Sequence, residues 1–181
     1  MYIALTDQRG SSEGDALRAF TDAQDSCREA EGFRWSMLLR STDNTARLAS
    51  VAMWLSPEHQ IAWRDANGSR IPTRRFDVSV ARGSMTPATT VTLVEWHPEP
   101  AQAARFSARW NAAYHPIENI IGSRLLQDLE SPSSYTGLHA VTDAGSLDSR
   151  TLSAELTDEE GLSITPTAVD RFEVILLTEA S

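Results

Sequence analysis

Two four-residue segments of this chain are nearly identical and lie far apart in the sequence. Arg75-Phe76-Asp77-Val78 reappears as Arg171-Phe172-Glu173-Val174, at an offset of 96 residues. A weaker likeness at an offset of 87 residues relates three pairs of segments: Ser36 to Ser123, Leu38-Leu39 to Leu125-Leu126, and Val51-Ala52 to Leu138-His139. Self-similarity of this kind indicates that one structural unit is used twice. The difference of nine residues predicts an insertion in the acidic stretch TDEEGLS of the second half.

The first half reads as β-α-β-β-α-β. Phe33, Trp35, Met37 and Leu39 alternate with polar residues, which is typical of a half-buried strand. Ser12 and Ser56 are predicted N-caps, and Pro57 is suited to the first position of a helix. The predicted strands and helices, in order, are residues 2–6, 15–30, 33–40, 47–55, 57–66 and 74–83.

The second half repeats this order less clearly after a linker at residues 84–90. Its helix has apolar residues at helical spacing and is predicted to stop at His115-Pro116. The remaining segments are a short helix at 143–150, an irregular acidic stretch and a closing strand. The predicted elements are residues 91–97, 101–115, 120–129, 135–141, 143–150, 152–156 and 171–179.

This pattern predicts an α+β fold of two tandem ferredoxin-like (βαββαβ) repeats, at residues 1–84 and 90–181. A four-stranded antiparallel sheet with helices on one face leaves its other face bare, and a second copy of the sheet is a suitable cover. We therefore expect the two sheets to pack face to face as a dimeric-type α+β barrel within one chain. Helices would lie outside, and a cavity would lie between the sheets.

The composition excludes several partners. The chain carries 25 acidic and 16 basic residues, a net charge of −9. Nucleic acids and anionic membranes both require a positive face, so neither is expected as a partner. Cys27 is the single cysteine, which excludes a disulfide framework and a cysteine-based metal cluster. No apolar run approaches the length of a membrane span and no leader pattern is present, so we expect a cytoplasmic protein.

His59 and Trp63 are the first candidate site residues. They are four residues apart on a predicted helix, so they can share a face. Trp63 would form a wall of an aromatic pocket and His59 would accept or donate a proton. In the alternative, Trp63 packs the helix on the sheet and His59 is solvated. Trp35 and Trp54 are candidates for substrate stacking, with core filling as the alternative.

The other candidates are His139 and Arg74. His139 interrupts an apolar strand and is either a catalytic residue or a satisfied core histidine. Arg74 could anchor an anionic ligand or remain solvated. The four histidines show no metal-binding spacing, so no metal is expected. Cys27 lies on the apolar face of its helix and is predicted to be an inert core thiol.

The run from Gly32 to Trp63 resembles the antibiotic biosynthesis monooxygenase (ABM) group of dimeric α+β barrels. The matching features are Gly32-Phe33 at the entry to a strand, Trp54 at the end of the next, and a Ser56-initiated helix that carries Trp63. The resemblance covers residues 2–83 and, more faintly, 90–179. It implies the barrel fold and, for some members, oxygenation of aromatic polyketides without metal or haem. Arg150 falls where the second half would place Trp63, which suggests that this half is degenerate.

Haem-degrading members would require an Asn on the first strand, the helix Trp and a His near or after that helix. This sequence offers Trp63, but its first strand has no Asn and nothing after Trp63 supplies the His. Our functional hypothesis is an ABM-like monooxygenase that acts on a small aromatic, polyketide-like molecule in an apolar barrel pocket. The alternative is a non-catalytic barrel that binds a small molecule or mediates assembly. No cofactor is expected, although reduced flavin is left open, as is formation of a homodimer.

Overall fold

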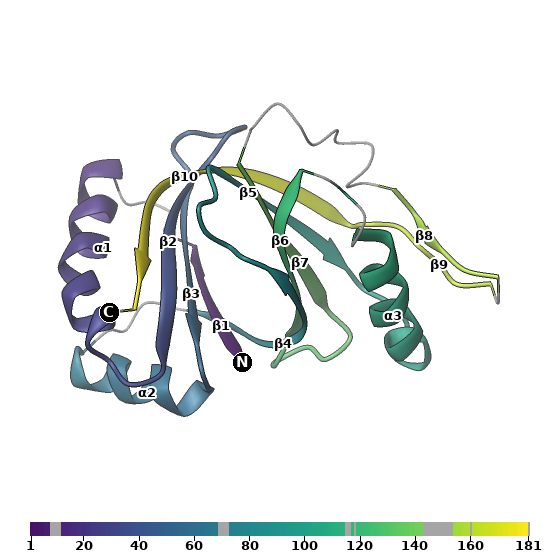
Figure 1. Cartoon of the computed structure of the whole chain (residues 1–181), viewed down its shortest axis with the longest axis horizontal. Helices are drawn as coiled ribbons and strands as arrows, with labels where there is room; N and C mark the ends of the chain where they lie inside the picture. The colour runs from purple at the N-terminus through teal and green to yellow at the C-terminus, as the bar shows by residue number, and fades with distance from the viewer. Residues whose placement is uncertain are drawn as a thin grey trace. The chain divides into compact units, whose positions relative to one another are not determined.

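The computed structural model describes residues 1–7, 12–68, 73–114, 117, 119–142, 154–159 and 161–180 (Figure 1). These residues form two compact units. The first contains residues 1–76 and 173–181, and the second contains residues 77–172. The unit boundaries fall inside two long strands, so the division at residues 84–90 stays a prediction from the sequence.

The first unit is built on a three-stranded antiparallel arrangement with two helices on one side (Figure 1). Strand β3 pairs with both β1 and β2. Ser12 caps the first helix as predicted, since its side chain accepts a hydrogen bond from the Asp15 N–H at 3.1 Å. The elements are β1 (Tyr2–Asp7), α1 (Glu13–Arg28), β2 (Phe33–Ser41), β3 (Leu48–Trp54) and α2 (Pro57–Ala66), followed by β4 (Arg74–Gly83), which begins in this unit and continues into the second.

The second unit repeats this arrangement, with β7 pairing with both β5 and β6. Its helix α3 packs Phe106, Trp110 and Tyr114 into a core cluster with strand residues such as Trp96. The short helix predicted at 143–150 lies outside the described residues, as does the stop at His115-Pro116. The elements are β5 (Thr90–Trp96), η1 (Pro100–Gln102), α3 (Ala103–Tyr114), β6 (Ile120–Asp128), β7 (Tyr135–Val141), β8 (Leu156–Thr157) and β9 (Ser163–Ile164), followed by β10 (Ala168–Glu179), which begins in this unit and ends in the first.

The hydrogen-bonded order of the eight long strands is β1-β3-β2-β10-β5-β7-β6-β4, and it closes into a barrel. Around this ring, β4-β1-β3-β2 and β10-β5-β7-β6 are each in the 4-1-3-2 order of a ferredoxin-like βαββαβ sheet. The predicted α+β barrel fold is therefore confirmed.

The acidic stretch in which the sequence predicts an insertion forms a two-stranded hairpin, β8–β9. Leu156, Leu162 and Ile164 from this hairpin are buried in the same cluster as the aromatic residues of α3. Arg105 of α3 also forms an ion pair with Asp158, with 2.5 Å between Nη2 and Oδ1. The insertion therefore adds core to the second unit instead of extending into solvent as an irregular loop.

The alternation predicted for Phe33 and Trp35 is interrupted by a β-bulge. The pairing register shifts between these two residues, so that Phe33 pairs with Trp54 while Trp35 pairs with Met53. Phe33 therefore joins the cluster that contains Trp54 and Cys27. Because successive strand residues face opposite sides, Trp35 faces away from Trp54. A bulge adds one residue to one strand, and apolar periodicity alone does not reveal it.

Candidate functional site

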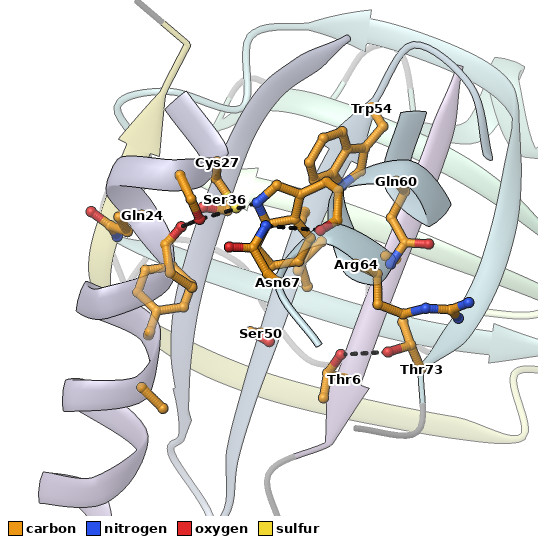
Figure 2. Close-up of a pocket in the computed structure, with 18 of the residues that line it drawn as sticks. Thr6, Gln24, Cys27, Ser36, Ser50, Trp54, Gln60, Arg64, Asn67 and Thr73 are labelled. Carbon is orange, nitrogen blue, oxygen red and sulfur yellow. Dashed lines mark hydrogen bonds between the residues drawn. The ribbon is translucent and has the colours of Figure 1, made fainter. Parts of the chain in front are cut away.

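The first unit contains a cavity of about 360 Å³ between its two helices and the strands β1, β2 and β3 (Figure 2). This volume lies in the range of sites for small organic molecules. The cavity lies on the helix side of the strands, whereas the sequence pattern predicts a pocket between two sheets. The large side chains of this unit do not fill the space because small residues of α1 and of the strands line much of it.

Two tryptophans form an aromatic wall of this cavity. The rings of Trp54 and Trp63 lie 5.7 Å apart between centroids at an interplanar angle of 39°. Trp63 is held by its Nε1, which donates a hydrogen bond to Ser26 Oγ at 3.1 Å. Trp54 is 1% exposed and packs edge-on against Phe33, with 5.2 Å between the ring centroids. The wall is therefore fixed by contacts from α1, β2 and β3 before any ligand enters.

The strand floor of the cavity consists of small residues. Ala4, Ala52 and Ser36 face one another across three strands, because Ala52 pairs with both of the others, and all three line the cavity. Directly opposite residues in antiparallel strands share a face. A flat ring can approach the backbone closely over such a surface.

The polar side chains around the cavity come from both helices, from the strands β1, β2 and β3, and from Thr73. Gln60 is 5% exposed and its Oε1 has no hydrogen-bond partner within the described part of the chain. Asn67 ends α2 and donates from Nδ2 to the carbonyl oxygen of Trp63 at 2.8 Å. Asp22 and Arg64 supply one charge of each sign. The site is therefore shaped for a small molecule of low net charge.

Cys27 also lines the cavity, from α1. Burial raises the pKa of its thiol to about 12, so the thiolate is not populated near neutral pH. The prediction of an inert thiol agrees with this environment. Cys27 supplies apolar surface and no nucleophile.

His59 lies outside the residues that line the cavity, although Trp63 lines it. Its Nδ1 lies 2.9 Å from Ser56 Oγ, and its Nε2 lies 3.8 Å from a carboxylate oxygen of Glu31. The ring packs against Gly32, where an added Cβ would lie 2.4 Å from the imidazole. Residues four apart on a helix are neighbours, but here Gln60 takes the position at the cavity.

Trp35 and Arg74 are likewise absent from the cavity lining. Trp35 is buried in the core, which agrees with its core-filling alternative. The Arg74 guanidinium lies over the Phe76 ring, 5.0 Å from the centroid. Of the six candidate residues from the sequence, the cavity of the first unit brings together Trp54 and Trp63.

Ser36, Ala52 and Gln60 line the cavity and were not predicted from the sequence. Their pattern carried some signal, since Ser36 and Ala52 both lie in the segments that recur at an offset of 87 residues. No feature of the sequence indicated Gln60, because a lone amide on a helix is more often exposed to solvent.

His139 lies in the second unit and is completely buried. Its imidazole lies 4.5 Å from the Tyr114 ring and 5.4 Å from the Trp110 ring, the latter in a stacked arrangement at 27°. Its Nδ1 is 3.1 Å from Ser123 Oγ. Burial lowers the pKa of His139 to about 3, so the ring is neutral near pH 7.

The two units share the same pairing register around these residues. His139 pairs with Ser123 and Thr92, just as Ala52 pairs with Ser36 and Ala4. A bulge also occurs at the corresponding place, between Ile120 and Gly122. The position that holds a methyl group in the first unit therefore holds an imidazole in the second.

Gly137 shows how tightly the second unit is filled. An added Cβ at Gly137 would lie 2.8 Å from the Trp96 ring and 2.9 Å from His139 Nε2. The corresponding position in the first unit is Ser50, which lines the open cavity. A second cavity, also about 360 Å³, lies beside this cluster and is lined by Arg82, Asn111 and Ser123 among others.

Within the described residues there is no group of three or more His, Cys, Asp or Glu side chains that could hold a metal ion. Nor does that part of the chain contain a helix long and apolar enough to cross a membrane. Arg150, the expected counterpart of Trp63, lies outside the described residues.

No protein-family model matches the chain, and no curated protein matches it either. Solved structures do match over almost its whole length. A putative monooxygenase from Fusobacterium nucleatum gives a TM-score of 0.74 at 11% identity, covering 98% of this chain and 94% of that one. An anthrone oxidase-like protein gives 0.67 at 9% identity, covering 99% and 93%. A ferredoxin-fold protein from Listeria monocytogenes, described as related to antibiotic biosynthesis monooxygenases, gives 0.58 at 11% identity, covering 96% and 95%.

These matches define the chain as an α+β barrel protein with the fold of ABM-related proteins. The resemblance predicted from the sequence is confirmed at the level of the fold.

Proposed function

We propose that the cavity of the first unit binds a small aromatic, polyketide-like molecule and that the protein oxidises it as an ABM-like monooxygenase. The observation that carries this proposal is the aromatic wall of Trp54 and Trp63 beside a floor of small strand residues. Flat aromatic molecules interact most favourably with such rings in offset or tilted arrangements. The fold shared with putative monooxygenases and an anthrone oxidase-like protein supports the same assignment.

The proposed reaction converts an activated ring CH₂ group to a carbonyl. The substrate loses a proton to give a carbanion, which transfers electrons to O₂, and the balanced change is CH₂ + O₂ → C=O + H₂O. The substrate supplies all four electrons. The protein contributes positioning, exclusion of water and the positive charge of Arg64 near a developing anion.

Binding without catalysis is the second candidate function, and one observation favours it. Among the described residues that line the cavity there is no histidine, because His59 faces Ser56 and Glu31. A substrate would then have to be acidic enough to lose its proton to solvent. A catalytic role for His59 or His139 stays a prediction, as do the cytoplasmic location and a homodimer.

Oxygen uptake with anthrone as the probe tests the proposal. We expect protein-dependent O₂ consumption with formation of anthraquinone, and about a tenfold lower kcat/KM for Trp63→Phe, from the loss of ring contact. Trp110→Phe, the same substitution on the helix of the second unit, is the matched control and should retain activity. Assays with and without reduced flavin test the cofactor. Saturable binding with no O₂ uptake in either assay would favour the second candidate.

The variant His59→Ala distinguishes loss of the substrate proton to solvent from its transfer to His59. If the proton leaves to solvent, this variant keeps the activity of the parent protein. A loss of activity with unchanged binding would instead support the catalytic role predicted for His59.

A further inference from the structure

His139 fills, in the second unit, the position that Ala52 leaves open in the first. Each residue lies on the middle strand of its unit and pairs with a serine on one neighbouring strand. In the second unit this serine, Ser123, hydrogen-bonds the ring edge of His139 at 3.1 Å. In the first unit the corresponding Ser36 lines the cavity. The second unit therefore contains, as one of its own side chains, a flat ring in the place of a ligand.

We propose that the first unit binds its ligand with an aromatic ring over Ala52, in the place that the His139 imidazole fills in the second unit, and with a polar atom at the ring edge hydrogen-bonded to Ser36 Oγ. This inference rests on the proposed binding of a small aromatic molecule and specifies its chemistry. The ligand class is a planar ring system that bears a hydroxyl, carbonyl or ring nitrogen at one edge.

The helices that cover these two positions also differ in the size of the side chains that they present. In the second unit the imidazole is covered by Trp110 and Tyr114 of α3. In the first unit α1 presents Ala19, Phe20, Ala23 and Cys27 to the cavity, and Figure 2 shows Cys27 there. The first unit is therefore open on the side of the strands where the second unit packs three side-chain rings. A ligand of two or three fused rings fits this description better than a single ring.

The contacts of His139 also indicate how the ligand is held. A neutral ring with a single hydrogen bond to a serine is stable in the second unit, since burial strongly favours the uncharged imidazole. The wall of Trp54 and Trp63 supplies aromatic contact in the first unit. Ser36 is then a specificity residue that selects ligands with a polar ring edge, and Ala52 sets the depth of the site.

A matched pair of probes tests the inference without oxidation. 1-Naphthol and naphthalene differ by one hydroxyl, and both are titrated against the full-length protein in the absence of oxygen, with binding followed by tryptophan fluorescence. We expect 1-naphthol to bind about tenfold more tightly than naphthalene, because Ser36 Oγ would remain unpaired beside naphthalene. Ser36→Ala should remove this preference, while Ser123→Ala, the matched serine of the second unit, should keep it.

Ala52→His should abolish binding of both probes, because its imidazole would occupy the ring position beside Ser36. Ala52→Val is the milder version and should weaken both probes without changing the preference between them. Thermal melts of each variant identify a loss of folding. A preference that persists in Ser36→Ala, full binding by folded Ala52→His or Ala52→Val, or no binding of either probe to the parent protein would overturn the inference. Failure of the oxidation assay with Ser36-dependent binding intact would count only against catalysis.

Discussion

Ala52 and His139 hold the same place in two equivalent strand pairings, one opposite Ser36 and the other opposite Ser123. The difference between a methyl group and an imidazole at this place accompanies an open cavity in one unit and a packed aromatic cluster in the other. The same fold therefore leaves space over Ala52 in the first unit and places aromatic side chains around the equivalent His139 in the second.

Exchanging the residues at positions 137 and 50 should destabilise the protein by different amounts. Gly137→Ser should lower the free energy of unfolding by about 1–3 kcal/mol, because its Cβ would overlap the Trp96 ring and His139. Ser50→Gly should cost at most about 1 kcal/mol, the usual penalty for glycine in a strand. Urea denaturation of both variants measures the two values. Equal effects would contradict the account of a filled and an open unit.

Stability should fall in acid because of His139. Burial lowers its pKa to about 3, below the value of about 6.5 for an exposed histidine. Below pH 6.5 the unfolded chain therefore binds a proton that the folded chain does not, and stability decreases by up to about 1.4 kcal/mol per pH unit until the folded pKa is reached. Above pH 6.5 this contribution is constant.

The variant His139→Asn isolates this effect, because asparagine can still hydrogen-bond Ser123 and does not titrate. Unfolding free energies of the parent and the variant are compared between pH 4 and 7.5. The difference between them should shrink as the pH falls. A difference that does not change with pH would contradict the neutral, buried state of His139.

Cys27 should be unreactive in the folded protein. Burial raises the pKa of its thiol to about 12, so thiol reagents at pH 8 meet almost no thiolate. We expect reaction with a disulfide reagent at least about 100-fold more slowly than in the unfolded chain, from the difference in thiolate fraction. A rate equal to that of the chain in urea would show that the thiol is exposed to solvent and would contradict its place in the cavity wall.

The hairpin β8–β9 should stabilise the second unit. Asp158 pairs with Arg105 and also accepts a hydrogen bond from the Leu162 N–H at 2.9 Å. Asp158→Ala should lower the free energy of unfolding by about 1–3 kcal/mol, because the backbone donor of Leu162 loses its partner. Glu159→Ala, at an adjacent position in the same turn, is the control. Matched losses in both variants would indicate a general effect of charge.

Much of the fold was predictable from the sequence because strand and helix periodicity and the recurring segments all indicate the same order of elements. The N-cap at Ser12, the Pro57 start of α2 and the insertion near TDEEGLS all correspond to features of the structure. The bulge after Phe33 was not predictable, since it depends on pairing with β3. It separates Trp35 from Phe33, which apolar alternation had placed on one face.

The site was less predictable for a physical reason. Large aromatic residues are readily chosen as site candidates from a sequence, and two of them, Trp54 and Trp63, form the aromatic wall of the cavity. The open space, however, is made by small residues such as Ala52, whose significance appears only against His139 in the equivalent place. His59 shares a helix with Trp63, yet its contacts with Ser56 and Glu31 hold it at the start of α2. Only the pairing register relates the two units residue by residue.

The position of a bound ring is the most direct test of this account. In protein with ¹³C-labelled alanine methyl groups, NOEs from the ring protons of 1-naphthol should reach the methyl groups of Ala4 and Ala52. The methyl group of Ala140, buried in the second unit, should show none. NOEs to Ala140 in place of Ala4 and Ala52, or to neither set, would contradict the claim that the first unit holds a ligand where the second holds His139.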